Sequence, residues 1–357
     1  MLVELLLAAV AVAPQPCASA TPDCTEWIKP SGHPSRILVY RTYPLETKNE
    51  NITRAFVFVH GILRDADNHF RTALAAAFLA NTLNDTIIVA PRFASNSSAP
   101  GNETGNCRDS LASDEANWIC DNQRPDTWRS GGTEVAANKL SSFDFMDEIL
   151  RRLARKEVFP NLKTIVIAGH SAGGQFVIRY EMLNQVHDTL GIPISYVVAN
   201  PSSYAYVDSL RPTASAFPSA ISPAAQGAAE SNHSNAPAFL PFADAKNCTG
   251  YDTWPYGLKG RPGHASALSD EQITKQLVAR SVTYLLGEAD VLPLGVFDTS
   301  CPAMAQGPTR LGRGVAFHKY VSENLHARHG LVIVPFCSHS QRCMFTSDIA
   351  LPLMFPK

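Results

Sequence analysis

Charged side chains are scarce in this chain, and neither sign dominates. Asp, Glu, Lys and Arg make up 17% of the 357 residues, and the formal net charge is −2. The sequence also has no run of basic residues. Clustered positive charge is what attracts nucleic acid and anionic membrane surfaces, so its absence argues against both as partners.

Long apolar runs are missing beyond the N-terminus. No later stretch reaches the roughly 20 apolar residues that span a bilayer, so we expect no membrane span. The cysteine spacing resembles no zinc site, and the sequence calls for no metal and no cofactor. With 45% hydrophobic residues, the chain can instead bury one large core.

The one long apolar stretch begins at Met1 and is followed by Ala18-Ser19-Ala20, a small-residue cleavage pattern. We therefore interpret residues 1–20 as a secretory signal peptide, residues 21–357 as one domain, and the protein as secreted and extracellular. Glu4 and the absence of Lys or Arg from the leading segment leave an alternative open, in which an apolar helix is retained.

Six N-x-Ser/Thr acceptor sites agree with a secretory route and predict a glycoprotein. They are Asn51, Asn84, Asn96, Asn102, Asn232 and Asn247.

The eight cysteines predict disulfide bonds. Cleavage after Ala20 would remove Cys17 and leave one thiol free or intermolecular. The pairs that we favour are Cys107–Cys120, which would close a polar loop, and Cys248–Cys301. A Cys337–Cys343 bridge would clamp the segment between them. Sequence spacing alone does not fix this connectivity.

Short apolar runs alternate with helical segments, a pattern typical of an α/β fold with a mainly parallel sheet. The runs hardly alternate in polarity, which predicts strands covered on both faces. Helical spacing from Phe143 to Leu153 and from Phe176 to Leu183 indicates helices with core side chains. The expected strands are 37–41, 55–59, 86–90, 164–168, 195–199, 282–286 and 331–335.

Two segments interrupt this alternation. Residues 94–132 are rich in Asn, Ser, Gly and Asp, and their length predicts a functional or disulfide-tied loop. Residues 204–275 form a cap-like insertion, in which 212–241 is of low complexity and predicts a mobile surface segment. The aromatic stretch 252–256 has enough apolar surface to cover a pocket.

The sequence Gly169-His170-Ser171-Ala172-Gly173 lies between an apolar strand and a helical segment. This is the setting of a nucleophile elbow, in which a strained turn holds the serine hydroxyl clear of the sheet. Larger side chains at the two glycines would collide with the adjoining strand and helix. Ser171 is therefore the candidate nucleophile.

A serine hydroxyl needs a base, and the base needs a carboxylate to orient it. With this elbow the acid and then the histidine follow the serine in the chain, each after a strand. Asp290 is the first choice for the acid and Glu288 the second, while His339 follows the last strand as the base.

Backbone N–H groups of Ile62 and Ala172 are the candidate oxyanion donors. Ile62 follows a strand that ends in His60-Gly61, and Ala172 begins the helix after the elbow. We expect His60 to brace its loop and His170 to line the elbow. His318 and His329 are expected to be structural.

These parts, in this order, resemble the α/β-hydrolase superfamily from about Ile37 to the C-terminus. The stretches 169–184, 198–204 and 339–345 also resemble a group of uncharacterised secreted microbial hydrolases. The resemblance implies the α/β-hydrolase fold, with an eight-stranded, mostly parallel sheet flanked by helices, and acyl-enzyme chemistry. A lipase-type His-Gly-Gly-Gly loop is absent, which disfavours a triglyceride lipase.

The sequence thus favours a serine hydrolase acting on a small-molecule or polymeric carboxylic ester. An amidase, peptidase or lactonase would use the same triad, and a non-catalytic binding protein on this scaffold is the alternative from another class. By analogy with ligand sites at strand ends, the substrate pocket is expected to include Asn200, Ser202, Ser203 and Tyr204.

Overall fold

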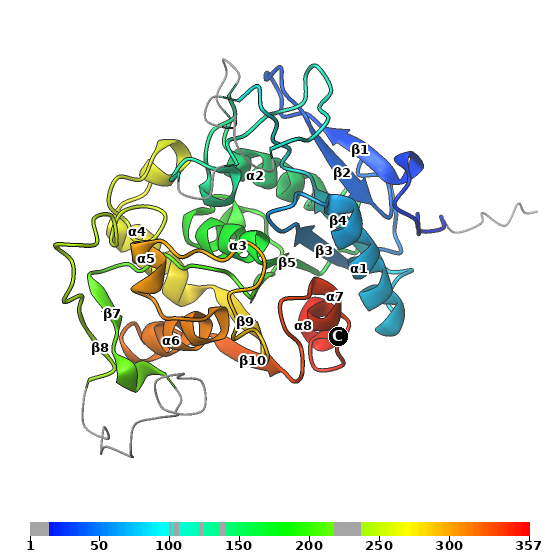
Figure 1. Ribbon diagram of the computed structural model, residues 1–357. Helices are drawn as coiled ribbons and strands as arrows, with labels where there is room; N and C mark the ends of the chain where they lie inside the picture. Colours follow the sequence, from blue (N-terminus) through cyan, green and yellow to red (C-terminus); the bar gives the residue numbers. More distant parts are fainter. Residues whose placement is uncertain (1–13, 100–101, 103–106, 121–123, 136–139, 218–236) are drawn as a thin grey trace, which may run out of the picture.

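The sheet of the computed structural model has eight strands in the order β1-β2-β4-β3-β5-β6-β9-β10 (Figure 1). The structure describes residues 14–99, 102, 107–120, 124–135, 140–217 and 237–357. The pairs β1–β2 and β2–β4 are antiparallel, and every other pair is parallel. The strands are β1 (Thr25–Ile28), β2 (Ile37–Arg41), β3 (Arg54–Val59), β4 (Thr86–Pro91), β5 (Thr164–His170), β6 (Ile194–Ala199), β9 (Ser281–Gly287) and β10 (Gly330–Val334).

Seven of these strands are the ones predicted from the apolar runs, and β1 was missed. Its four residues, Thr25 to Ile28, include only two apolar side chains, too few for a periodic signal. The prediction that the strands are covered on both faces is wrong for β10. That strand lies at the edge of the sheet, and most of its residues are half-buried.

Helices cover both faces of the sheet (Figure 1). In β3, Ala55, Val57 and Val59 belong to one core cluster with α2, α3, α4 and α6, whereas Phe56 and Phe58 pack against α1, α7 and α8. Both predicted helices, α2 and α3, are present. The helices are α1 (Ala66–Leu79), α2 (Ser142–Leu153), α3 (Ala172–Leu183), α4 (Asp270–Ala279), α5 (Cys301–Met304), α6 (Arg310–Glu323), α7 (Gln341–Phe345) and α8 (Leu351–Met354). Within the described residues, no helix is both long and apolar enough to cross a bilayer.

The insertion carries a two-stranded antiparallel sheet, β7 (Leu210–Pro212) with β8 (Phe239–Pro241). Most of the low-complexity stretch, residues 218–236, lies outside the described residues, so its predicted mobility stays a prediction. The aromatic stretch packs on the body of the protein: the indole N–H of Trp254 donates to the Ser130 carbonyl at 2.9 Å.

All eight cysteines of the full chain are paired, and the expectation of one unpaired thiol after cleavage at Ala20 stays a prediction. The pairs Cys107–Cys120, Cys248–Cys301 and Cys337–Cys343 are confirmed. Cys17 pairs with Cys24, a bond that cleavage after Ala20 would break. The cleavage point stays a prediction, and the apolar run of residues 1–13 lies outside the described residues.

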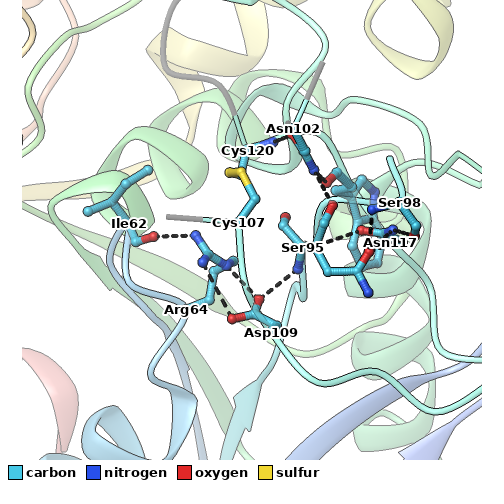
Figure 2. Close-up of a disulfide and its surroundings, with 11 residues drawn as sticks. Ile62, Arg64, Ser95, Ser98, Asn102, Cys107, Asp109, Asn117 and Cys120 are labelled. Carbon is cyan, nitrogen blue, oxygen red and sulfur yellow. Dashed lines mark hydrogen bonds and ion pairs between the residues drawn. A yellow bond between two sulfur atoms is a disulfide. The ribbon is translucent and has the colours of Figure 1, made fainter. Parts of the chain in front are cut away.

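The acceptor sites differ in accessibility. Asn51, Asn84 and Asn247 are exposed, and Asn232 lies outside the described residues. Asn102 is buried beside the Cys107–Cys120 bond, and its side-chain amide donates to the carbonyls of Asn96 and Trp118 (Figure 2). A glycan would replace one N–H of that nitrogen and so remove one of the two hydrogen bonds at a buried side chain, and the structure argues against glycosylation of Asn102 in the folded protein.

Phe176 of α3 provides a test of the packing. Its ring lies 5.0 Å from the ring of Phe93 and 5.1 Å from that of Phe143, with no exposed surface. We predict that Phe176→Ala lowers the free energy of unfolding in urea by about 3–5 kcal/mol, because it leaves a cavity. The control Phe78→Ala removes a ring that is 74% exposed and should change stability by less than about 0.5 kcal/mol. Equal losses in the two variants would contradict the assigned core.

Candidate active site

Ser171 lies on a sharp turn between β5 and α3. Its φ of 59° and ψ of −117° are strained for a residue with a side chain. A Cβ on Gly169 would collide with the Gly173 carbonyl, and one on Gly173 would collide with the Val59 carbonyl of β3. Two glycines are therefore required for the helix to start this close to the sheet.

His339 and Asp290 lie beside this turn. In sequence, His339 is 168 residues from Ser171 and 49 residues from Asp290. His339 Nε2 lies 2.9 Å from Ser171 Oγ, and His339 Nδ1 lies 2.8 Å from Asp290 Oδ2. Asp290 follows β9 and His339 follows β10, so both loops leave the carboxyl edge of the sheet beside the elbow. The geometry can pass a proton from the serine to the imidazole while the carboxylate fixes the ring.

Arg310, at the start of α6, contacts the Asp290 carboxylate oxygen that does not contact His339. The sequence analysis did not predict this contact. Its guanidinium lies 3.4 Å from Asp290 Oδ1, and neither side chain is more than 1% exposed. The same group donates to Ser202 Oγ at 3.0 Å and to the carbonyls of Leu294 and Val296, both at 3.0 Å. Burial lowers the pKa of the Arg310 guanidinium, and the Asp290 carboxylate opposes that shift. Arg310 therefore links the acid to the loop that follows it.

Glu288, the second choice for the acid, does not contact the histidine. Its Oε2 accepts a hydrogen bond from the Phe336 N–H at 2.9 Å, which ties the β9 loop to the segment that carries His339. The glycine at position 287 lets the end of β9 approach the segment that carries His339, because a Cβ there would lie 2.5 Å from the Cys337 carbonyl oxygen.

Ile62 and Ala172, the expected oxyanion donors, line the same cavity as Ser171. Ala172 is the first residue of α3, where the backbone N–H has no partner within the helix. Ile62 follows β3, and its carbonyl accepts from Arg64 at 2.7 Å, while Arg64 also pairs with Asp109 at 2.6 Å (Figure 2). The disulfide-tied loop 94–132 thus fixes the segment that carries Ile62.

His60 and His170 are both buried, and burial lowers their pKa well below the usual value. His60 bridges the Gly61 carbonyl at 2.8 Å and the Phe93 N–H at 2.9 Å, in the bracing role expected for it. The ring of His170 lies 4.6 Å from that of His339 and lines the elbow. His318 and His329 hydrogen-bond to each other away from the site, through the His329 carbonyl at 3.1 Å.

Two cavities meet at Ser171. The first, here the Arg129 cavity, has a volume of about 140 Å³ and is lined by Ile62, Arg129, Ala172, Gln175, Ser202 and the segment 296–300. The second, here the His339 cavity, has a volume of about 370 Å³ and is lined by residues that include Leu63, His69, His170 and His339. Both include Ser171, Ile62 and Val296.

Of the four residues expected in the pocket, Ser202 lines the Arg129 cavity, and the other three line neither of these two cavities. Asn200 is buried, accepts from the Gly287 N–H at 2.8 Å and donates to the Ser338 carbonyl at 3.4 Å. Ser203 accepts from Gln175 at 2.6 Å, and the ring of Tyr204 stacks on Phe317. These three side chains point into the protein and brace the loops, which corrects the prediction.

Arg129, Gln175 and the segment 296–300 line the Arg129 cavity but were not predicted to. Arg129 lies in the short 3-10 helix Trp128–Ser130, Gln175 lies on α3 and the segment 296–300 follows Asp290, so no common sequence pattern connects them. Among the described residues, no group of three or more His, Cys, Asp or Glu side chains is placed to hold a metal ion.

Solved structures share this architecture, which is the α/β-hydrolase fold implied by the sequence resemblance. A poly(aspartic acid) hydrolase from Sphingomonas sp. KT-1 matches with a TM-score of 0.55 and 19% identity, over 92% of this chain and 98% of its own. LpqC, a poly(3-hydroxybutyrate) depolymerase from Bordetella parapertussis, matches with a TM-score of 0.56 and 17% identity, over 93% and 87% of the two chains. No protein-family model and no curated protein matches the sequence. At these identities the likeness establishes the fold.

The contact between Arg310 and Asp290 generates a prediction. Arg310→Met should slow the reaction of Ser171 with a fluorophosphonate about ten- to hundredfold, because the acid loses one of its two partners and the imidazole is less well oriented. Arg310→Lys, which keeps the charge, should recover part of that rate. The measurement is the rate of labelling, with the melting temperature recorded to establish that each variant is folded.

Arg313→Met is the matched control. Arg313 is equally buried and binds the Ser202 and Gly307 carbonyls, but it does not contact Asp290. It should slow labelling less than Arg310→Met does. The same loss in both variants would mean that Arg310 acts only through general packing.

Proposed function

We propose that this protein, which has the α/β-hydrolase fold, is a secreted serine hydrolase that cleaves carboxylic esters with Ser171, His339 and Asp290. The observation that carries the proposal is the unbroken chain of hydrogen bonds from Asp290 through His339 to Ser171, with distances of 2.8 and 2.9 Å. This chain of hydrogen bonds ends at Ser171, which has a strained backbone conformation and lines both cavities. These are the contacts that nucleophilic catalysis by a serine requires.

In the first half of the reaction, Ser171 Oγ attacks the acyl carbon and its proton passes to His339 Nε2. The carbonyl oxygen becomes an oxyanion, which the N–H groups of Ile62 and Ala172 would stabilise. The carbon–oxygen bond to the alcohol then breaks, and the alcohol leaves with the proton from His339. Asp290 stays ionised and stabilises the imidazolium.

In the second half, water attacks the acyl group on Ser171 and gives its proton to His339. The second tetrahedral intermediate collapses as His339 returns that proton to Ser171 Oγ. The products are the carboxylic acid and the free enzyme. The proton transfers use Ser171 and His339, whose side chains are hydrogen-bonded to each other in the structure.

The three disulfides that lie wholly within residues 21–357 support an oxidising compartment, because such bonds rarely persist in a reducing cytosol. Together with the apolar N-terminal run and the exposed acceptor sites, they support secretion of residues 21–357 as one glycosylated domain, with the insertion at 204–275. Small-molecule and polymeric esters are both candidate substrates. The two matching solved structures carry names of polymer-degrading enzymes, which supports including polymers in a substrate panel.

An amidase, peptidase or lactonase would use the same side chains, so a panel containing amides and lactones decides among them. The intact chain of hydrogen bonds at Ser171 favours catalysis over a binding-only role.

The test is fluorophosphonate labelling of the secreted protein, followed by peptide mapping. We predict one labelled residue, Ser171, and an ester-hydrolysis rate at least about 10⁴-fold lower in Ser171→Ala. Ser266→Ala, which alters an exposed serine outside both cavities, should label normally. Hydrolysis by Ser171→Ala at the rate of the unmodified protein would remove Ser171 from the mechanism.

A further inference from the structure

His339 distinguishes the two cavities that meet at Ser171. Its side chain lines the larger cavity and does not line the smaller one, whereas Ala172, an expected oxyanion donor, lines only the smaller one. A general acid must lie within hydrogen-bond reach of the oxygen that it protonates. In the proposed reaction His339 protonates the leaving alcohol, so the alcohol has to leave on the side of the His339 cavity.

We propose that the His339 cavity binds the alcohol part of the ester and selects apolar alcohols, with Leu63 as a residue that determines this specificity. The assignment rests on the proposed function and adds a substrate class to it: esters of uncharged, apolar alcohols with chains of several carbons. An acyl group as small as acetyl suffices for it.

The volume of the cavity suits a chain better than a methyl or ethyl group. At about 370 Å³, it falls within the roughly 300–1,000 Å³ typical of pockets that bind whole small ligands. The Arg129 cavity, on the other side, measures about 140 Å³. An ester with a long alcohol and a short acyl group therefore fits the site better than an ester with the two lengths exchanged.

The side chains that line the cavity favour an apolar occupant. Ile62, Leu63 and Val296 are aliphatic, and the described residues of the lining include no Lys or Arg. His69 and His170 also line it, and burial lowers the pKa of both imidazoles, so they are uncharged at neutral pH. A hydrocarbon chain that packs against the aliphatic side chains is removed from water, which is favourable by the hydrophobic effect.

The polar side chains of the lining keep contact with solvent. Asp65 and Gln341 are half-buried, and Ser340 is exposed. Asp65 also accepts a hydrogen bond from Asn68 at 3.2 Å, and its other oxygen lies 3.5 Å from His69 Nδ1. These groups can stay hydrated while an alcohol chain lies against the aliphatic side chains, so its binding does not leave them without partners. The Asp65 carboxylate disfavours an anionic alcohol and makes a cationic one the competing occupant.

Apolar surface continues outside the cavity. Leu63 is 62% exposed, and residues 291–296, which follow Asp290, are all exposed and include no charged side chain. Arg310 donates to the carbonyls of Leu294 and Val296, both at 3.0 Å, which holds this segment in place. Exposed apolar surface beside a cavity is typical of a ligand-binding groove. An alcohol that extends past Val296 meets further apolar side chains of the same segment.

The test compares isomeric esters that differ in which side of the ester carries the chain. Hexyl acetate and ethyl hexanoate contain the same atoms, so they differ chiefly in where the chain must bind. Acid release in a pH-stat gives kcat/KM below the solubility limit of each ester, with Ser171→Ala as the background. Each value is divided by the rate of hydrolysis by hydroxide, which corrects for intrinsic reactivity. We expect hexyl acetate to be preferred over its isomer and over ethyl acetate by about tenfold or more, since each methylene removed from water strengthens binding by up to about fourfold.

A second pair of esters tests the charge of the alcohol. Acetylcholine and 3,3-dimethylbutyl acetate have alcohols of the same shape, one ending in a quaternary ammonium and the other in a tert-butyl group. We expect the neutral ester to be preferred by about threefold or more after the same correction. The cation would lose hydration in the cavity, and the lining offers it only the hydrated Asp65 carboxylate in return.

Leu63→Ser should lower the hexyl-to-ethyl ratio of kcat/KM for the two acetates by about threefold or more. The ratio is taken within one variant, so a change in the neighbouring oxyanion hole that slows both esters equally cancels. Leu79→Ser, which alters an exposed leucine at the end of α1 outside both cavities, is the matched control and should leave the ratio unchanged.

An equal or higher corrected kcat/KM for ethyl hexanoate would overturn the placement of the alcohol, and a preference for acetylcholine would overturn the apolar character of the subsite. Either result would leave the esterase proposal standing. The same hexyl-to-ethyl ratio in Leu63→Ser and in the unmodified protein would overturn the role of Leu63. Absence of Ser171-dependent hydrolysis of all these esters would instead overturn both proposals.

Discussion

The hydrogen bond between His339 and Asp290 can form only because β9 and β10 run parallel and in register. Val334 pairs with Gly287, so the loops that carry the base and the acid leave the sheet side by side. The parallel pairing of β5 with β6 and of β6 with β9 then brings the same edge to Ser171. A shift of one residue in β10 would turn its side chains to the opposite faces and move His339 away from the serine. The proposed chemistry therefore depends on strand register as much as on the three side chains.

Buried arginines keep the irregular segments around this edge in place. Arg179 donates to the Pro255 carbonyl at 3.1 Å, Arg310 to that of Leu294 at 3.0 Å and Arg313 to that of Gly307 at 2.7 Å. These loops have no strand partner to satisfy their carbonyls, and a guanidinium offers five donors in a fixed plane. Removal of one such residue would leave several buried acceptors unpaired at once.

The sequence predicted best the residues whose position is determined by the strand or helix that they belong to or follow. Apolar runs located seven of the eight strands, and chain order after the elbow identified Asp290 and His339 as the residues that the structure places beside Ser171. The pocket was predicted poorly because the direction of a loop side chain has no periodicity. Asn200, Ser203 and Tyr204 lie at the correct edge of the sheet but point inward, where they bind backbone, Gln175 or Phe317. Arg310 could not be recognised, because its partner Asp290 lies 20 residues away across a loop.

Three of the four disulfides lie in segments that build the site, not in the sheet. Cys337–Cys343 brackets His339, Cys107–Cys120 closes the loop that leads to Arg129, and Cys248–Cys301 ties the insertion to the end of the cavity segment 296–300. The strands are held by a hydrogen-bonded ladder that these loops lack, although Trp118 and Trp128 of the loop 94–132 belong to the core. The covalent links therefore restrict motion where the geometry of catalysis is set by side chains on loops.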